Sequence, residues 1–163
     1  MTEKFRPNAG IVVFRDDKKV LVCKRNNESS EYWQFPQGGI DSNETPIQAA
    51  YRELKEETNI TSVKLIKNLK FPITYRYPPE VLEYFKKKGR QEIGQQQYWT
   101  LFYFYGSDNE IDFCTNPEEI EFSDYRWIDI KTAPQLVWDP KKAAYRQMVE
   151  IFSPVIESWK NVL

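Results

Sequence analysis

Three glutamates in one short stretch are spaced to bind a divalent metal ion. Glu53, Glu56 and Glu57 would fall within an arc of about 100° on a helix of about 3.6 residues per turn. Like charges at this spacing repel each other unless a cation lies among them. Carboxylate oxygens without Cys or His nearby favour Mg²⁺ or Mn²⁺ over zinc, and Mg²⁺ commonly binds through carboxylates plus substrate phosphates. The pattern therefore predicts an enzyme that acts on polyphosphates.

A helix beginning after Thr45 would position these carboxylates. Pro46 suits the first helical position, and Gln48 completes a capping box with Thr45. Residues at helical spacing form a stripe expected to face a core: Ile47, Ala50, Tyr51, Leu54 and Thr58. The alternative for the carboxylates taken alone is a solvated helix face, which most helices rich in Glu and Lys present.

The surroundings of the three glutamates resemble the Nudix box of the Nudix hydrolase family. The spacing is G-x5-E-x7-R-E-U-x-E-E-x-G-U, where U is a bulky aliphatic residue, and it is matched by Gly38, Glu44, Arg52, Glu53, Leu54, Glu56, Glu57 and Ile60. Asn59 replaces the second glycine at a site expected to be left-handed, where Asn is the next most tolerated residue. The segments FRPNAGIVVF, WQFPQGGID, IGQQQYW and EFSDYRW resemble the RNA pyrophosphohydrolase and diadenosine polyphosphate hydrolase branch.

The resemblance implies roles for the matching residues. The metal ligands would be Glu53, Glu56, Glu57, Glu121 and the backbone carbonyl of Gly38. Glu121 would reach the metal from a loop, and Glu118 and Glu119 compete with it for this role. Arg52 would orient the carboxylates, with Glu44 as its partner. Glu53 or Glu121 is the candidate general base, since the chain has no histidine.

A second group of residues is expected to hold the substrate. Arg6, Arg25 and Lys141 are candidate clamps for phosphates, and Tyr77 and Trp138 are candidates for stacking on a base. The alternatives are solvated cations and aromatic side chains packed in the core. The implied substrates are 5′-triphosphorylated RNA, which would lose pyrophosphate, or dinucleoside polyphosphates. A Nudix-fold module that only binds nucleotides is the other alternative, and the intact acidic spacing favours the enzyme.

Composition limits the class of protein. The chain has 163 residues, 40% of them hydrophobic, and we expect one domain, residues 1–163. A net charge of −1 argues against bulk electrostatic binding of nucleic acid, so contact with RNA requires a local patch such as the basic stretch 86–90. That stretch is otherwise a solvated loop.

Cellular context follows from what the sequence contains. Cys23 and Cys114 are the only cysteines, both expected to be small buried side chains, and no signal peptide or long apolar run is visible. The prediction is a cytoplasmic protein without a membrane segment or an evident stable protein partner.

The order of elements predicts a mixed α/β domain. Residues 9–14 and 20–24 read as a hairpin, and residues 98–106 as a central strand. Further strands are expected at 63–69, 71–77, 110–113 and 125–130, and a short helix or loop at 79–90. A second amphipathic helix starts at Asp139 and carries Ala144, Met148, Ile151 and Phe152, and Pro154 is expected to end or kink it. The Nudix resemblance implies an α/β/α sandwich with a mixed central sheet.

Overall fold

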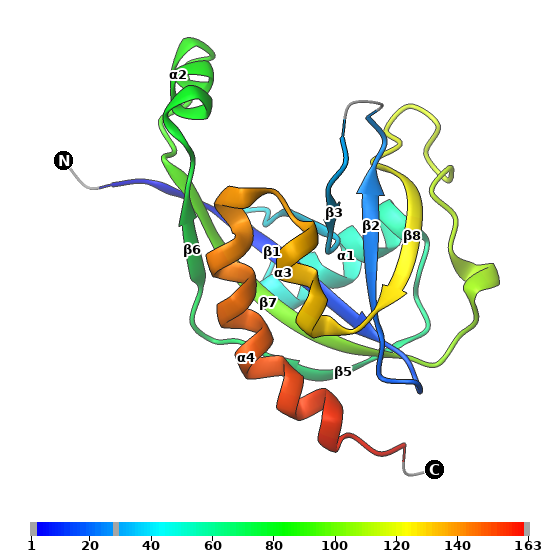
Figure 1. The fold of residues 1–163 in the computed structure, drawn as a ribbon. Coiled ribbons are helices and arrows are strands. Elements are labelled where there is room, and N and C mark those ends of the chain that lie inside the picture. Colours follow the sequence, from blue (N-terminus) through cyan, green and yellow to red (C-terminus); the bar gives the residue numbers. More distant parts are fainter. Residues whose placement is uncertain (1–2, 28–29, 162–163) are drawn as a thin grey trace.

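The chain folds as an α/β/α sandwich. The computed structural model describes residues 3–27 and 30–161, so residues 1, 2, 28, 29, 162 and 163 of the predicted domain lie outside the described part. A mixed sheet of eight described strands lies between α1 (Pro46–Thr58) on one side and α4 (Lys142–Ser158) on the other (Figure 1). The predicted fold class is confirmed.

Four strands precede the first helix, and helices and strands are interspersed after it. The strands are β1 Phe5–Phe14, β2 Val20–Arg25, β3 Trp33–Gln34, β4 Gln37–Gly39, β5 Val63–Asn68, β6 Ile73–Arg76, β7 Gly94–Phe104 and β8 Phe122–Ile128. Two short helices are α2 Pro79–Lys87 and α3 Ala133–Leu136, and 3₁₀ turns lie at Asp108–Glu110, Ile130–Thr132 and Asp139–Lys141.

The long strand β7 organises the sheet. It pairs in parallel with β1 from Phe5 opposite Gly94 to Phe14 opposite Tyr103, and antiparallel with β5 and β6. On the other side, β2 pairs antiparallel with β1, β3 and β8. The short strand β4 pairs with β1 and carries the glycine pair to the start of α1. The predicted central strand and first hairpin are therefore present.

Each face of the sheet has its own hydrophobic core. Successive residues of β1 point to opposite faces, so Val13 joins the core against α1 and Phe14 the core against α4. Leu54 of α1 and Phe152 of α4 are both fully buried in these cores. Burying a side chain of this size contributes about 1.5 to 3 kcal/mol, so these contacts hold both helices against the sheet.

One predicted strand is absent, and one of the two alternatives for Pro154 is excluded. Residues 110–113 form no strand. Glu110 instead binds the segment that follows α1, because its carboxylate accepts hydrogen bonds from the Thr61 and Ser62 backbone N–H groups at 2.8 and 3.0 Å. Pro154 does not end α4, which continues to Ser158. A proline inside a helix costs about 3 kcal/mol, and burial of the neighbouring Phe152 and Ile156 side chains offsets that cost.

Three side chains expected to be buried are exposed. Tyr51 is 42% exposed, with its ring centroid 4.7 Å from that of Phe102, so it covers the edge of the core without entering it. Ile151 of α4 is also 42% exposed. Cys114 is exposed in the loop before β8, whereas Cys23 is buried in β2, and both are free thiols. Loop position explains Cys114, since that segment has no strand that would turn it inward.

Candidate active site

Local capping determines where α1 begins and ends. The Thr45 hydroxyl accepts a hydrogen bond from the Gln48 N–H at 3.2 Å, and the Gln48 side chain accepts one from the Thr45 N–H at 2.9 Å. At the other end Asn59 is left-handed, with φ of 68°, and its side-chain amide donates to the Glu110 carbonyl at 3.0 Å. These caps fix the two ends of α1, and burial of Ala50 and Leu54 against the sheet determines the face on which its carboxylates lie.

The glycine strand β4 lies directly against the first of these carboxylates. A Cβ atom on Gly38 would stand 2.0 Å from the Glu53 Cδ, so the glutamate occupies the space that any larger residue would need. Next to it, the Gln37 N–H donates to a Glu57 carboxylate oxygen at 3.3 Å. The glycine is therefore required by the close approach of backbone and carboxylate.

Arg52 connects four oxygen-bearing groups around the start of α1. Its Nε and Nη2 donate to the two Glu44 oxygens at 3.0 and 2.5 Å, and Nη2 also donates to the Gly39 carbonyl at 2.9 Å. Its Nη1 donates to Glu53 at 2.8 Å and to Glu56 at 3.2 Å. The Arg52 hydrogen bonds hold the pKa of Glu44 down at about 2. Arg52 thus lies where a residue that orients the carboxylates is expected.

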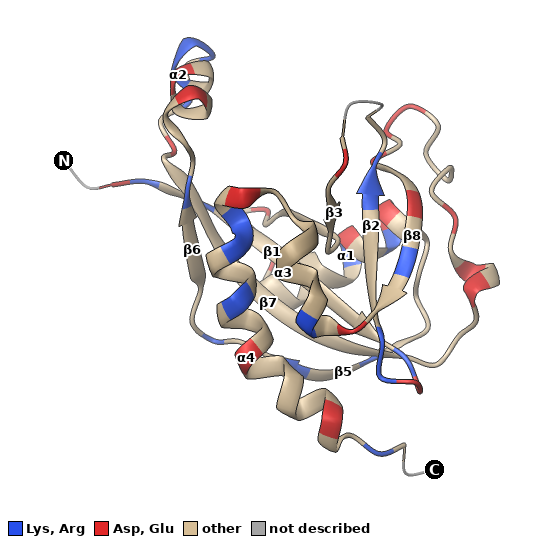
Figure 2. Cartoon of the chain, viewed as in Figure 1, with Lys and Arg blue, Asp and Glu red and all other residues tan. Residues whose placement is uncertain are grey.

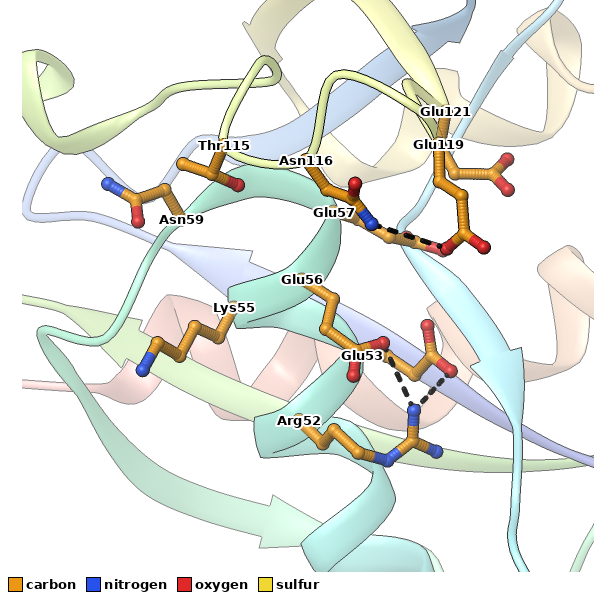
Figure 3. Close-up of a pocket in the computed structure, with 10 residues that line it drawn as sticks. All are labelled: Arg52, Glu53, Lys55, Glu56, Glu57, Asn59, Thr115, Asn116, Glu119 and Glu121. Atoms are coloured by element: carbon orange, nitrogen blue, oxygen red, sulfur yellow. Dashed lines mark hydrogen bonds and ion pairs between the residues drawn. The ribbon is translucent and has the colours of Figure 1, made fainter.

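The carboxylates line an acidic pocket of about 630 Å³. Figure 3 shows Glu53, Glu56 and Glu57 projecting from α1, with Glu119 and Glu121 entering from the loop before β8. Burial raises the pKa of Glu57 to about 9, and the charges of Glu53 and Glu121 add to the effect. Burial also raises the pKa of Glu53, whose side chain is 14% exposed. This pocket concentrates negative charge that has too few cations beside it.

The donor set of the acidic pocket fits a hard divalent cation. All its charged donors are carboxylate oxygens, the ligands that Mg²⁺ and Mn²⁺ prefer. Among the residues that the structure describes, no three acidic or sulfur side chains converge as they would around an ion. Nη1 of Arg52 takes one oxygen each of Glu53 and Glu56.

Two of the three candidates for the distal glutamate line the acidic pocket. Glu119 and Glu121 line the acidic pocket, whereas Glu118 lines a neighbouring depression with Arg25. Glu121 acts electrostatically on both buried glutamates of α1. Sequence reasoning missed four further residues of the acidic pocket: Lys55, Asn59, Thr115 and Asn116. Thr115 and Asn116 lie in an irregular loop, where no periodic pattern points to them.

A second pocket, of about 490 Å³, contains all five predicted substrate-binding residues. These are Arg6, Arg25, Tyr77, Trp138 and Lys141. Arg90, from the basic stretch 86–90, also lines it, whereas sequence reasoning did not select others such as Tyr32, Gln34, Tyr75, Val81, Phe85 and Gln95. The second pocket adjoins the acidic pocket at Gln37, because Gln37 lines the second pocket and its backbone N–H donates to Glu57, which lines the acidic pocket.

Lys141 is a buried cation in the wall of the second pocket. Its residue is 6% exposed, and none of the described carboxylates lies within 4.0 Å of its Nζ. Burial, followed by the charge of Arg25, lowers the pKa of Lys141 to about 7, and Glu57 opposes this shift. Tyr77 is also 6% exposed and packs between Tyr75 and Phe85. The pocket therefore combines cations with aromatic walls, as recognition of a nucleotide polyphosphate requires.

Fold and site define a Nudix protein. The NUDIX domain model matches residues 4–149, so the chain belongs to the Nudix family, as its sequence predicts. The RNA pyrophosphohydrolase of Pelagibacter ubique (strain HTCC1062) is 43% identical over 145 residues, which cover 89% of each chain. The RNA pyrophosphohydrolase of Caulobacter vibrioides (strain NA1000 / CB15N) is 41% identical over 148 residues, covering 90% of this chain and 85% of the relative.

Solved structures share the fold at lower identity. The E. coli dihydroneopterin triphosphate pyrophosphohydrolase superposes with a TM-score of 0.67 and 22% identity, covering 93% of this chain and 99% of that one. A C. elegans Ap4A hydrolase in a binary complex gives a TM-score of 0.63 and 20% identity, covering 91% and 98%. At these identities the likeness establishes the architecture alone.

Proposed function

We propose that this chain is a single metal-dependent hydrolase domain that removes pyrophosphate from the 5′-triphosphate end of RNA and leaves a 5′-monophosphate. The observation that carries the proposal is the junction of the acidic pocket with the cationic second pocket at Gln37. Relatives named RNA pyrophosphohydrolase, at 43% and 41% identity over most of the chain, support this choice of substrate.

The acidic pocket would hold Mg²⁺ or Mn²⁺. Its proposed ligands are Glu53, Glu56, Glu57, Glu121 and the carbonyl oxygen of Gly38. When bound, such ions neutralise charge on phosphate oxygens and make a nearby water more acidic. Every other step is carried by the side chains of the protein.

The second pocket would hold the polyphosphate beside the metal ligands. Arg6, Arg25 and Lys141 present cations to its oxygens, and the aromatic walls bind the first nucleotide. Water attacks a phosphorus atom of the anhydride between the α and β phosphates. The anhydride P–O bond breaks, and its electron pair goes to the leaving group. The products are the 5′-monophosphate and pyrophosphate. Glu53 or Glu121 accepts the proton of the water. The contacts of Glu53 with Arg52 and Gly38 support Glu53, because they hold its carboxylate in one place.

Dinucleoside polyphosphate hydrolysis is the second candidate function. A dinucleotide also presents a purine followed by a charged phosphate chain, so the aromatic and cationic groups of the second pocket would accept it. A dinucleoside polyphosphate has no further nucleotides attached, whereas an RNA substrate continues beyond the second pocket. A module that only binds nucleotides is less favoured, because binding alone gives no reason to keep a self-repelling acidic pocket.

A substrate panel tests the proposal. We would measure hydrolysis of triphosphorylated RNA, diphosphorylated RNA, diadenosine tetraphosphate and free NTPs under one Mg²⁺ condition. We expect triphosphorylated RNA to give monophosphorylated RNA with the highest kcat/KM. Efficient cleavage of diadenosine tetraphosphate without hydrolysis of triphosphorylated RNA would instead identify a dinucleoside polyphosphate hydrolase.

A pair of variants controls the assay. Glu53→Gln removes a proposed ligand and base, and we expect at least about a 10²-fold loss of kcat. Glu150→Gln makes the same chemical change on an exposed residue of α4 and should leave turnover unchanged. Near wild-type turnover of Glu53→Gln at saturating Mg²⁺ would contradict the metal assignment.

The proposed location is the cytoplasm, as predicted from the sequence. No helix among the described residues is long and apolar enough to cross a membrane.

A further inference from the structure

The helix α2 stands away from the body of the protein. It connects β6 to β7 and projects beyond the sheet in Figure 1. Its inner side carries Val81 and Phe85, which are partly buried, pack on the core against α4 and line the second pocket. The outer side therefore begins directly at the rim of that pocket.

A row of four aromatic rings runs from the second pocket to the outside of α2. Neighbouring ring centroids lie 5.8 Å apart from Tyr75 to Tyr77, 5.0 Å from Tyr77 to Phe85 and 5.8 Å from Phe85 to Tyr84. Tyr75 and Tyr77 are buried at 7% and 6% exposure, Phe85 is half-buried, and Tyr84 at the outer end is 58% exposed. The last ring is therefore exposed, and a base could stack on it outside the pocket that holds the 5′ end.

Positively charged side chains lie beside this row of aromatic rings. Arg90 stacks over Phe85 at 4.1 Å in the pocket rim, and the Lys88 ammonium lies 5.6 Å from the Tyr84 ring. Lys86 and Lys87 precede Lys88 at the end of α2 and are exposed, which is why the far end of α2 is blue in Figure 2. None of the described carboxylates lies within 4.0 Å of these three ammonium groups. The three ammonium groups interact with the negative C-terminal end of the α2 helix dipole. They remain exposed to solvent and carry a positive charge there.

We propose that this outer side of α2 binds single-stranded RNA downstream of the 5′ end. The α2 surface, defined as Tyr84, Lys86, Lys87 and Lys88, would hold the nucleotides that follow those in the second pocket. The inference rests on the proposed function, because it is the 5′ end in the second pocket that leads the strand to α2. Charge complementarity and the continuous aromatic row favour RNA over a protein partner for this surface.

The test compares two triphosphorylated RNAs with the same 5′ dinucleotide. One is the dinucleotide itself, and the other is unstructured and about 12 nucleotides long. We would measure kcat/KM for both between about 50 and 200 mM salt. Each phosphate contact to a single strand contributes about 0.7 to the slope of log affinity against log salt concentration, so the three lysines together contribute about 2. The wild-type slope should be steeper for the long RNA.

Charge-neutral variants assign the effect to α2. In the triple variant Lys86→Gln, Lys87→Gln, Lys88→Gln, we expect the slope for the long RNA to fall by about 2, with the dinucleotide unaffected. The matched control neutralises the exposed lysines of the β5 region, Lys64, Lys67 and Lys70, which line neither pocket. It should leave both slopes unchanged. Circular dichroism should show both variants folded.

The outcomes separate the two proposals. Hydrolysis of both RNAs with equal salt slopes in the wild type, or an equal effect of the control variant, would overturn the α2 inference and leave the proposed function intact. If neither RNA is hydrolysed, both the α2 inference and the proposed function are overturned. Loss of the length-dependent slope in the α2 variant alone would support RNA binding by α2.

Discussion

Replacing Lys141 by Met should stabilise the protein while weakening its function. Lys141 is 6% exposed, and the pKa of its ammonium group falls from 10.5 to about 7 because burial disfavours the charged form. The unfolded chain keeps this proton up to about pH 10.5, so between the two pKa values the unfolded state binds more protons than the folded state. The stability of the wild type should therefore rise with pH across this interval.

The magnitude follows from the interval between the pKa values. At about 1.4 kcal/mol per pH unit, the full cost of the buried charge approaches about 5 kcal/mol below pH 7. Met has a similar volume and no charge, so it removes this cost and keeps the packing. With relaxation of the pocket around the charge, we expect a gain of about 2 to 4 kcal/mol in the free energy of unfolding at about pH 6.

Urea denaturation of the metal-free protein at about pH 6 and about pH 9 measures the gain. The difference between variant and wild type should shrink as pH rises, because the wild-type Lys141 is then neutral in the folded state. Lys142→Met is the matched control: Lys142 is partly exposed and paired with Asp139 at 3.1 Å, so its loss should change stability by no more than about 0.5 kcal/mol.

Turnover provides the second readout. We expect Lys141→Met to raise KM for triphosphorylated RNA, since the pocket loses a cation that a phosphate would pair with. A bound phosphate also favours the charged form, so wild-type affinity should fall as pH rises above about 7. A variant less stable than wild type at pH 6, or a stability gain that does not change with pH, would refute the reasoning.

Three further substitutions test the architecture of the acidic pocket. Gly38→Ala would place a Cβ atom against Glu53 and displace that carboxylate, lowering kcat by about 10²-fold in steady-state assays; unchanged kcat would argue against the packing. Arg52→Ala should abolish activity and cost about 1 to 3 kcal/mol, because it leaves its carboxylates unmatched, and an identical thermal melt would disprove this role. Asn59→Gly keeps the left-handed cap but loses one hydrogen bond, so stability should change by no more than about 1 kcal/mol and activity by a few fold.

The acidic helix could be predicted from the sequence because its determinants are local. The capping box at Thr45, the left-handed Asn59 and the spacing of the glutamates all lie within one helix and its two ends. Each feature acts through hydrogen bonds or rotation over a few residues, so a linear pattern contains it. The fold class followed from the same patterns and from the family resemblance.

Tertiary structure alone decided how the second pocket is completed. Its lining comes from β1, β2, β3, β4, β6, α2, β7 and the segments between them, together with the turn before α4. The parallel pairing of β1 with β7 is what places Arg6 opposite Gln95. No pattern within one segment could indicate that Tyr75, Phe85 and Arg90 meet there. Burial of Lys141 has the same origin, since a lysine at the start of a helix is ordinarily solvated. Long-range packing, which local propensity does not encode, selected these residues.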